Sequence, residues 1–193
     1  MSQAPRIIAF AGSTRAGSYN KKLVRIASTA ASKAGADVEV IDLKDYPLPL
    51  FDEDAEKEGG LPENAAKLKK LFIAADGFLL ASPEYNSSIT GVLKNTIDWI
   101  SRPVPNEPGL AGFMGKTAVL MSASPGGFGG LRGLVIVRSL LGNIGVTVLP
   151  DQVCVPKAYE AFNDDDSLKD AAQQTSIQGL GTKLANVLAK LKS

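Results

Sequence analysis

The chain has 193 residues, with 21 Lys and Arg against 20 Asp and Glu, no histidine and one cysteine, Cys154. Without histidine, Ser-His-Asp and Cys-His catalytic sets and imidazole-based metal sites are excluded, and a single cysteine excludes cysteine-rich zinc and iron–sulfur sites, so we expect no metal site. A formal net charge of +1 argues against broad electrostatic binding of nucleic acid or of an anionic membrane.

The length of the chain predicts a single domain over residues 1–193. The apolar runs are too short to span a membrane, and the N-terminus lacks the cationic and long apolar regions of a signal peptide. A single cysteine suits a reducing compartment, so we expect a cytoplasmic protein.

Apolar runs alternate with segments of helical periodicity along the chain. The predicted strands are residues 6–11, 37–43, 77–81, 116–122 and 146–149. The predicted helices are residues 23–34, 62–72, 89–100 and 131–142, and a last helix that Ser167 caps and that reaches Leu191. Gly35 is expected to end the first helix, and the polar residues 44–60 predict a long loop.

This alternation predicts an α/β fold with right-handed parallel crossovers. The strands are apolar throughout rather than alternating, so we expect a three-layer, doubly wound, five-stranded parallel sheet covered on both faces. In the strand order 2-1-3-4-5, the loops after strands one, three and four meet at one crevice, which is where such sheets bind ligands.

The loop after the first strand, GSTRAGSYN at residues 12–20, is rich in hydrogen-bond donors. The hydroxyls of Ser13, Thr14 and Ser18, the Asn20 amide and the backbone amides of the helix start can donate to an anion, and Arg15 adds a guanidinium suited to phosphate oxygens. This set favours a terminal phosphomonoester. The loop has neither the glycine spacing of a nicotinamide-dinucleotide turn nor the lysine of a Walker loop. The alternative is that Ser18 only caps the helix.

The loop after the third strand, SPEYNSS at residues 82–88, breaks a buried strand just before a helix. Pro83 stiffens its start. The backbone amides from Glu84 to Ser87 can face the polar edge of a planar ring, and Tyr85 offers an apolar face. An ordinary strand–helix turn capped by Ser88 is the alternative.

The loop after the fourth strand, SPGGFGG at residues 124–130, holds four glycines. Glycine lets the backbone approach a ligand closely, although a flexible surface turn would have the same composition. Because the three loops share one crevice, we expect them to form one binding site.

These loops resemble those of the NAD(P)H-dependent FMN reductase family of the flavodoxin-like fold, within it the chromate and quinone reductase branch. The resemblance covers residues 6–149 and rests on GSTRAGSYN (12–20), DYPLPLFD (45–52), SPEYN (82–86), GVLKNTIDW (91–99) and SPGGFGGLR (124–132). The most specific part is PEYN followed by LKNxIDW. Thr90 departs from a proline that is frequent in the family, which implies a looser helix start.

The resemblance implies non-covalently bound FMN, with NAD(P)H as co-substrate. The matching positions are Ser13, Arg15, Ser18 and Asn20 at the phosphate, Pro83, Glu84, Tyr85, Asn86 and Ser87 along the isoalloxazine ring, and Ser124 and Gly126 on the ring's other side. A homodimer or homotetramer with flavins near subunit interfaces is also implied.

A flavin would supply the redox chemistry that the side chains lack. We expect a ping-pong cycle in which hydride passes from nicotinamide C4 to flavin N5, and electrons then pass to quinones, flavins, ferric chelates, azo compounds or chromate. The backbone of residues 84–87 would stabilise charge on the reduced ring, and no side chain need act as acid or base. The alternative is a flavodoxin-type electron carrier, which the net charge disfavours because such carriers are strongly acidic.

Five other residues have bulky or reactive side chains. Arg102 and Arg132 either attract an anionic substrate or are surface arginines without a role. Trp99 and Phe72 are expected to pack in the core. Cys154 is expected after strand five, with no redox role.

Overall fold

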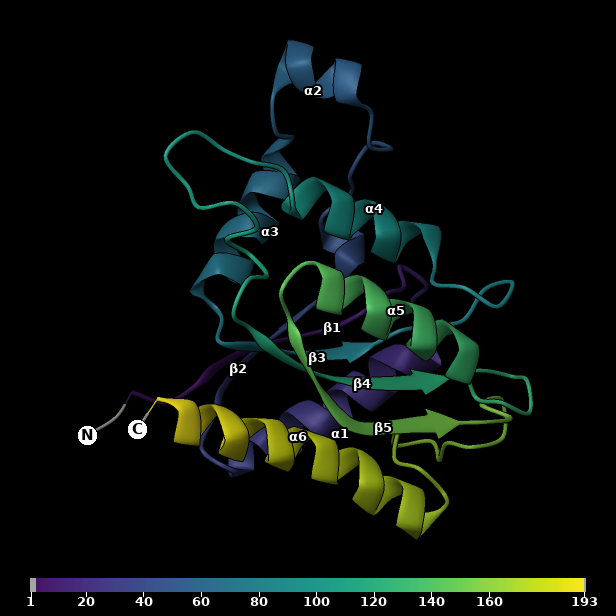
Figure 1. The fold of residues 1–193 in the computed structure, drawn as a ribbon. Coiled ribbons are helices and arrows are strands. Elements are labelled where there is room, and N and C mark those ends of the chain that lie inside the picture. The colour runs from purple at the N-terminus through teal and green to yellow at the C-terminus, as the bar shows by residue number, and fades with distance from the viewer. Residues whose placement is uncertain (1–2, 193) are drawn as a thin grey trace.

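The computed structural model describes residues 3–192, which form a parallel five-stranded sheet between two layers of helices (Figure 1). The strands are β1 (Arg6–Ala11), β2 (Asp37–Ile41), β3 (Gly77–Ala81), β4 (Thr117–Ala123) and β5 (Thr147–Val155). The helices are α1 (Tyr19–Lys33), the 3-10 helix η1 (Leu43–Asp45), α2 (Glu53–Gly59), α3 (Glu63–Ala74), α4 (Gly91–Ile100), α5 (Leu131–Asn143) and α6 (Ala171–Leu191). The order β2-β1-β3-β4-β5 confirms the predicted sheet.

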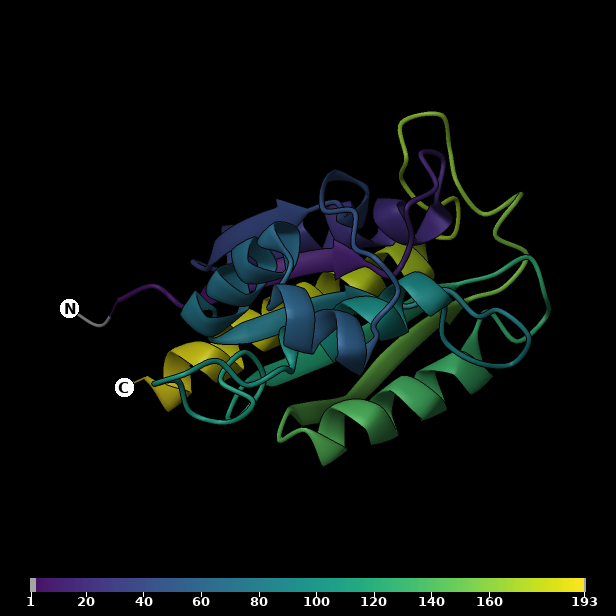
Figure 2. The same cartoon turned by 90° about the horizontal axis from the view of Figure 1, so that it is seen from above.

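The sheet has a hydrophobic core on each face, because successive side chains of a strand point to opposite faces. These two cores hold the helical layers against the sheet. Ile7 and Leu79 face α1 and α6, whereas Ile8, Phe10 and Phe78 face α3, α4 and α5. Figures 1 and 2 show α1 and α6 on one side of the sheet and the other three helices opposite. Within residues 3–192, no helix is long and apolar enough to cross a bilayer.

The two edge strands, β2 and β5, differ from the prediction in solvent exposure, and β5 also differs in length. The central strands are buried along nearly their whole length, but β2 and β5 are partly solvent-exposed, and the Val40 side chain is 52% exposed. Strand five does not end at Leu149 but continues to Val155, since an edge strand tolerates Pro150. Cys154 therefore lies within β5, opposite Ser122 of β4, and not after the strand.

The last helix begins later than predicted. Asp170, not Ser167, is the N-cap of α6, and its carboxylate accepts hydrogen bonds from the amides of Ala172 (2.8 Å) and Gln173 (3.1 Å). Ser167 instead donates its hydroxyl to Asp165 at 2.6 Å within the preceding loop.

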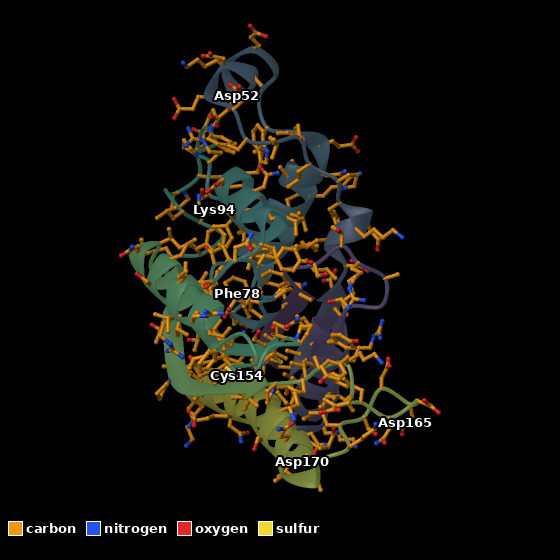
Figure 3. All side chains as sticks on the ribbon, turned by 90° about the vertical axis from the view of Figure 1, so that its right-hand side faces the viewer. Asp52, Phe78, Lys94, Cys154, Asp165 and Asp170 are labelled. Atoms are coloured by element: carbon orange, nitrogen blue, oxygen red, sulfur yellow. The ribbon has the colours of Figure 1, made fainter. Side chains whose placement is uncertain are left out.

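The prediction that residues 44–60 form a long loop is wrong, because this segment contains the end of η1 and all of α2. The carboxylate of Asp52 caps α2, which projects from the body of the protein (Figures 1 and 3). Asn95 and Trp99 of α4 hold the base of this projection: Asn95 accepts from the Phe51 amide and donates to the Pro49 carbonyl, and the Trp99 indole also donates to Pro49, each at 2.8 Å. Two segments that carry the family resemblance thus bind each other.

The start of α4 was also predicted wrongly. The helix begins at Gly91 rather than Ile89, and the Thr90 hydroxyl caps it by accepting from the Leu93 amide at 3.2 Å. The same hydroxyl donates to the Gly12 carbonyl at 2.7 Å. Thr90 therefore fixes the helix start to the first loop and does not loosen it.

Candidate functional site

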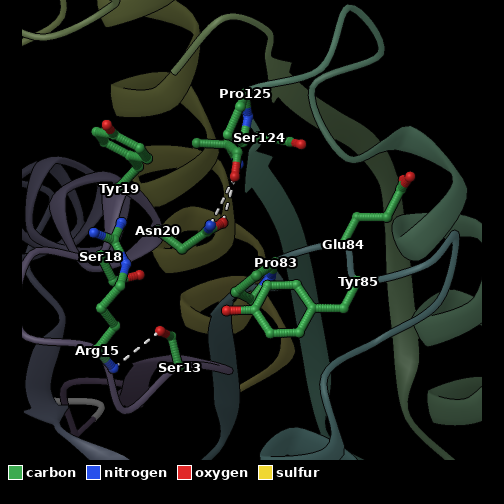
Figure 4. Close-up of a pocket in the computed structure, with 11 residues that line it drawn as sticks. Ser13, Arg15, Ser18, Tyr19, Asn20, Pro83, Glu84, Tyr85, Ser124 and Pro125 are labelled. Atoms are coloured by element: carbon green, nitrogen blue, oxygen red, sulfur yellow. Dashed lines mark hydrogen bonds between the residues drawn. The ribbon is translucent and has the colours of Figure 1, made fainter. Parts of the chain in front are cut away.

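The three predicted loops meet at one cavity of about 290 Å³ at the carboxyl ends of β1, β3 and β4 (Figure 4). Its lining residues are Ser13, Arg15, Ser18, Tyr19, Asn20, Pro83, Glu84, Tyr85, Ala123, Ser124 and Pro125. The volume is at the lower end of the roughly 300–1,000 Å³ of small-molecule pockets.

The first loop supplies the donor-rich wall. Ser18 occupies the N-cap position of α1 in an extended conformation, but its side chain makes no capping hydrogen bond in the part of the chain that the structure describes. The missing capping bond argues against the alternative in which the Ser18 side chain only caps the helix. The first turn of α1 contains no acidic residue, so its free amides and partial positive charge remain available to an anion.

Arg15 provides a positive charge without a carboxylate partner among residues 3–192. Its backbone amide donates to the Ser13 hydroxyl at 3.3 Å, and its guanidinium lies 5.1 Å from the centre of the Tyr19 ring. Figure 4 shows the side chain running along the loop toward Tyr19. An unpaired guanidinium beside a helix N-terminus favours binding of a phosphate group.

Asn20 has a structural task that the sequence did not indicate. Its buried amide donates to the Ala123 carbonyl at 2.8 Å and accepts from the Ala123 amide at 3.0 Å. These bonds tie the start of α1 to the end of β4. One N–H of the Asn20 side chain is left for a ligand.

The second loop forms a tight turn in which Asn86 and Ser87 both have positive φ angles, 51° and 65°. Tyr85 and Ser88 exchange backbone hydrogen bonds of 2.9 and 3.0 Å across it, so the Tyr85 amide is already paired. The positive φ angles at both central residues are those of a type I′ turn. Asn86 and Ser87 lie at the tip of the turn, beyond the cavity wall that Glu84 and Tyr85 help to form.

Glu84 acts through its side chain as well as its backbone. The carboxylate, 7% exposed, accepts from the Gly133 amide at 3.0 Å and from Arg132 at 2.7 and 2.9 Å. Burial raises the pKa of Glu84, but these hydrogen bonds outweigh it and hold the pKa below its ordinary value. The Arg132 guanidinium also lies 5.5 Å from the centre of the Phe128 ring. Arg132 therefore joins the second loop to α5.

The third loop contributes Ser124 and Pro125 to the cavity, while Gly126 lies outside the lining. The Ser124 hydroxyl accepts from the Gly126 amide at 3.3 Å. Gly130 has a φ of 94°, and a Cβ there would overlap the Ser122 side chain. Glycine at this position is thus required by packing as well as by backbone conformation.

The other four residues singled out in the sequence lie outside the cavity lining: Arg102, Trp99, Phe72 and Cys154. Arg102 pairs with Glu56 of α2 at 2.8 Å. Trp99 and Phe72 are buried in the core, as predicted. Burial, followed by the charge of Glu84, raises the pKa of the Cys154 thiol, which disfavours a reactive thiolate.

Three lining residues were missed in the sequence: Tyr19, Ala123 and Pro125. Tyr19 stands between two selected residues and was overlooked because it is not a phosphate donor. Ala123 and Pro125 have no polar side chain, and only their neighbour Ser124 signals their place.

These residues fit a ligand that joins a phosphate to a planar ring. One wall has the Ser18 hydroxyl, the helix N-terminus and Arg15, which has no carboxylate partner among residues 3–192, while the facing wall has Pro83 and the Tyr85 ring (Figure 4). A phosphomonoester would be held at the first wall. A flat ring would lie along the second.

Comparison with known proteins gives a consistent result. A family model described as NADPH-dependent FMN reductase matches residues 5–160. The chain is 42% identical to an NAD(P)H:quinone oxidoreductase of Solanum tuberosum, covering 97% of this chain and 94% of that one. It is 36% identical to an NAD(P)H-dependent FMN reductase of Pseudomonas aeruginosa, covering 92% of each. The solved structure of FerB, a flavoenzyme NAD(P)H:(acceptor) oxidoreductase from Paracoccus denitrificans, aligns with a TM-score of 0.77 at 26% identity, covering 96% of this chain and 98% of that one.

Proposed function

Since the chain belongs to the NADPH-dependent FMN reductase family, we propose that it is an FMN-dependent enzyme that oxidises NAD(P)H and reduces small acceptors such as quinones. The observation that carries this proposal is the cavity itself. It sets the Arg15 guanidinium and the N-terminus of α1 opposite the wall formed by Pro83 and Tyr85 (Figure 4).

Bound FMN would supply hydride and electron transfer, which no side chain of this histidine-free protein performs. Ser13, Arg15, Ser18 and the remaining N–H of Asn20 hold the phosphate. Pro83 and Tyr85 orient the ring.

Of the backbone amides of residues 84–87 that we assign to the ring edge, that of Glu84 lies in the cavity wall, those of Asn86 and Ser87 lie at the tip of the turn, and that of Tyr85 is already paired within the turn. Such donors stabilise negative charge that develops at a ring edge. Ser124 closes the cavity from the other side, and Gly126 lies behind it in the same loop.

The finer features of the activity also belong to this proposal. NAD(P)H and the acceptor use the same open face of the ring in turn, which gives ping-pong kinetics. Quinones, free flavins, ferric chelates, azo compounds and chromate are the acceptor classes. The protein acts in the cytoplasm as a homodimer or homotetramer.

Two measurements on the purified protein test the proposal. Titration with FMN, followed by quenching of flavin fluorescence, should show saturable binding. Anaerobic addition of NADH or NADPH should then bleach the oxidised flavin absorbance, and a quinone should restore it. A protein that binds no FMN contradicts the proposal. A protein that binds FMN but is reduced by neither nucleotide would be the electron carrier instead.

A further inference from the structure

We propose that Phe162 and Asp166 are positioning residues that hold Arg15, through Tyr19, at the phosphate end of the cavity. Both lie in residues 156–170, which connect β5 to α6 and lie outside the cavity lining. This inference rests on the proposed function, because it assigns a role in binding the phosphate of FMN. Figure 2 shows the connection rising beside the N-terminal end of α1.

A stack of four side chains links the connection to the first loop. The Arg15 guanidinium lies 5.1 Å from the centre of the Tyr19 ring. The Tyr19 ring stacks on Phe162, with centres 5.8 Å apart and planes inclined by only 7°. The Lys22 ammonium lies 5.2 Å from the centre of the Phe162 ring. Phe162 thus lies between a residue that lines the cavity and a cation of α1.

Asp166 fixes this connection to α1. Its carboxylate pairs with Lys22 at 2.6 Å and with Arg25 at 3.0 Å, one turn further along the helix. Asp166 has a φ of 67° in a turn closed by pairing of Phe162 with Leu168. The turn therefore presents the Phe162 ring and the Asp166 carboxylate to the same helix.

The contact between Arg15 and the Tyr19 ring matters because few other contacts hold the Arg15 side chain. Arg15 is exposed, and no described residue offers it a carboxylate. A free arginine side chain loses much rotamer freedom when it binds a ligand, whereas a stacked one has already lost part of it. Preorganisation of Arg15 should raise affinity for the phosphate and leave contacts to the ring unchanged.

The test compares FMN with riboflavin, which has the same ring and no phosphate. We expect Phe162→Leu to raise the Kd for FMN about three- to tenfold, the range of one aromatic contact, with riboflavin binding unchanged. Phe162→Tyr keeps the ring and should restore wild-type FMN affinity. Tyr159→Leu removes an aromatic side chain that is 62% exposed on the same connection, and it should change neither Kd.

A double-mutant cycle tests whether the effect passes through Arg15. Phe162→Leu should cause no further loss of FMN affinity in the Arg15→Ala background. Additive losses, or equal losses for FMN and riboflavin, would overturn the proposal. So would unchanged FMN affinity in Phe162→Leu.

Asp166→Asn provides a second route if Phe162→Leu does not fold. Asparagine tolerates positive φ, so the turn is kept while both ion pairs lose their charge. We expect FMN affinity to fall about two- to fivefold and riboflavin affinity to stay constant. Unchanged FMN affinity contradicts the inference. If the wild-type protein binds no FMN, the proposed function is contradicted. If the wild type binds FMN but the variants bind it equally well, only the positioning role is contradicted.

Discussion

Ser87 has a backbone conformation that suits glycine better than serine. Its φ of 65° is left-handed, and the left-handed region costs an L-residue roughly 1–2 kcal/mol. We expect Ser87→Gly to raise the free energy of unfolding by about 1 kcal/mol, measured by urea denaturation. Ser88→Gly is the control: Ser88 is not among the positive-φ residues, so glycine there should bring no gain. A gain from Ser88→Gly equal to that from Ser87→Gly would contradict the explanation.

Glu84 should make stability depend on pH in the acid range. Burial raises its pKa, but hydrogen bonds from Gly133 and Arg132 outweigh burial and keep the folded-state pKa below 4.5. The carboxylate therefore stabilises the fold fully at pH values well above the ordinary carboxyl pKa and loses this effect as pH falls through the lower folded-state pKa.

Replacing this carboxylate measures its contribution. Glu84→Gln should lower the free energy of unfolding by about 1–2 kcal/mol at neutral pH, with the difference from wild type shrinking in acid. Glu58→Gln, at an exposed position of α2, should leave the pH profile unchanged. A constant difference between Glu84→Gln and wild type at every pH would show that the charge is not responsible.

Helix α4 depends on a single hydroxyl at its start. Thr90 caps the helix and donates to Gly12 of the first loop, so Thr90→Val removes both bonds while keeping the side-chain volume. We expect a loss of about 2 kcal/mol in the free energy of unfolding. Thr90→Ser keeps the hydroxyl and should lose clearly less. Equal losses for the two variants would assign the effect to packing.

Helices α1 and α6 pack closely at one glycine. A Cβ at Gly181 would overlap the carbonyl oxygen of Ala27 in α1. A Cβ at Gly179, half a turn away, would meet no atom of residues 3–192 within 4 Å apart from its chain neighbours and the local helix backbone. Gly181→Ala should therefore lower the free energy of unfolding by about 2 kcal/mol or more despite its better helix propensity. Gly179→Ala should raise it by up to about 1 kcal/mol. Thermal or urea unfolding of both variants gives the comparison.

The order of elements could be predicted because each strand and helix carries its own periodicity. Boundaries failed where contacts distant in the sequence decide them. Residues 44–60 looked like a loop because α2 is almost wholly exposed and has no apolar stripe. Strand β5 was cut at Pro150, because nothing in the sequence shows that this proline stands at a sheet edge.

The loops of the site could be selected from the sequence, but the partners of their side chains could not. The bonds of Asn20 to Ala123, of Glu84 to Arg132 and Gly133, and of Thr90 to Gly12 all join separate segments. Residue type indicates what a side chain can bind, and only the packed chain determines which partner it meets. The assignment of these residues to FMN remains a prediction.

The molecule as a whole should gain stability from its cofactor, because FMN would bind only the folded chain. At an FMN concentration one hundred times the Kd, the free energy of unfolding should rise by about 2.7 kcal/mol. For a chain of this size, that corresponds to a rise in Tm of roughly 5–10 °C in a thermal melt. Arg15→Ala should need more FMN to reach the same rise. An FMN-independent Tm would mean that the cavity does not bind FMN.

The link between Asn20 and Ala123 also has a consequence for biosynthesis. It joins positions 103 residues apart, and the segment that supports Tyr19 follows still later in the chain. A nascent chain on the ribosome would therefore carry the complete first loop long before it had the cavity. Because parallel strands that pair across long crossovers form slowly, flavin capture should coincide with the last cooperative step of folding. In refolding experiments, quenching of FMN fluorescence should then report completion of the sheet, and in the cell the cofactor would join only finished chains.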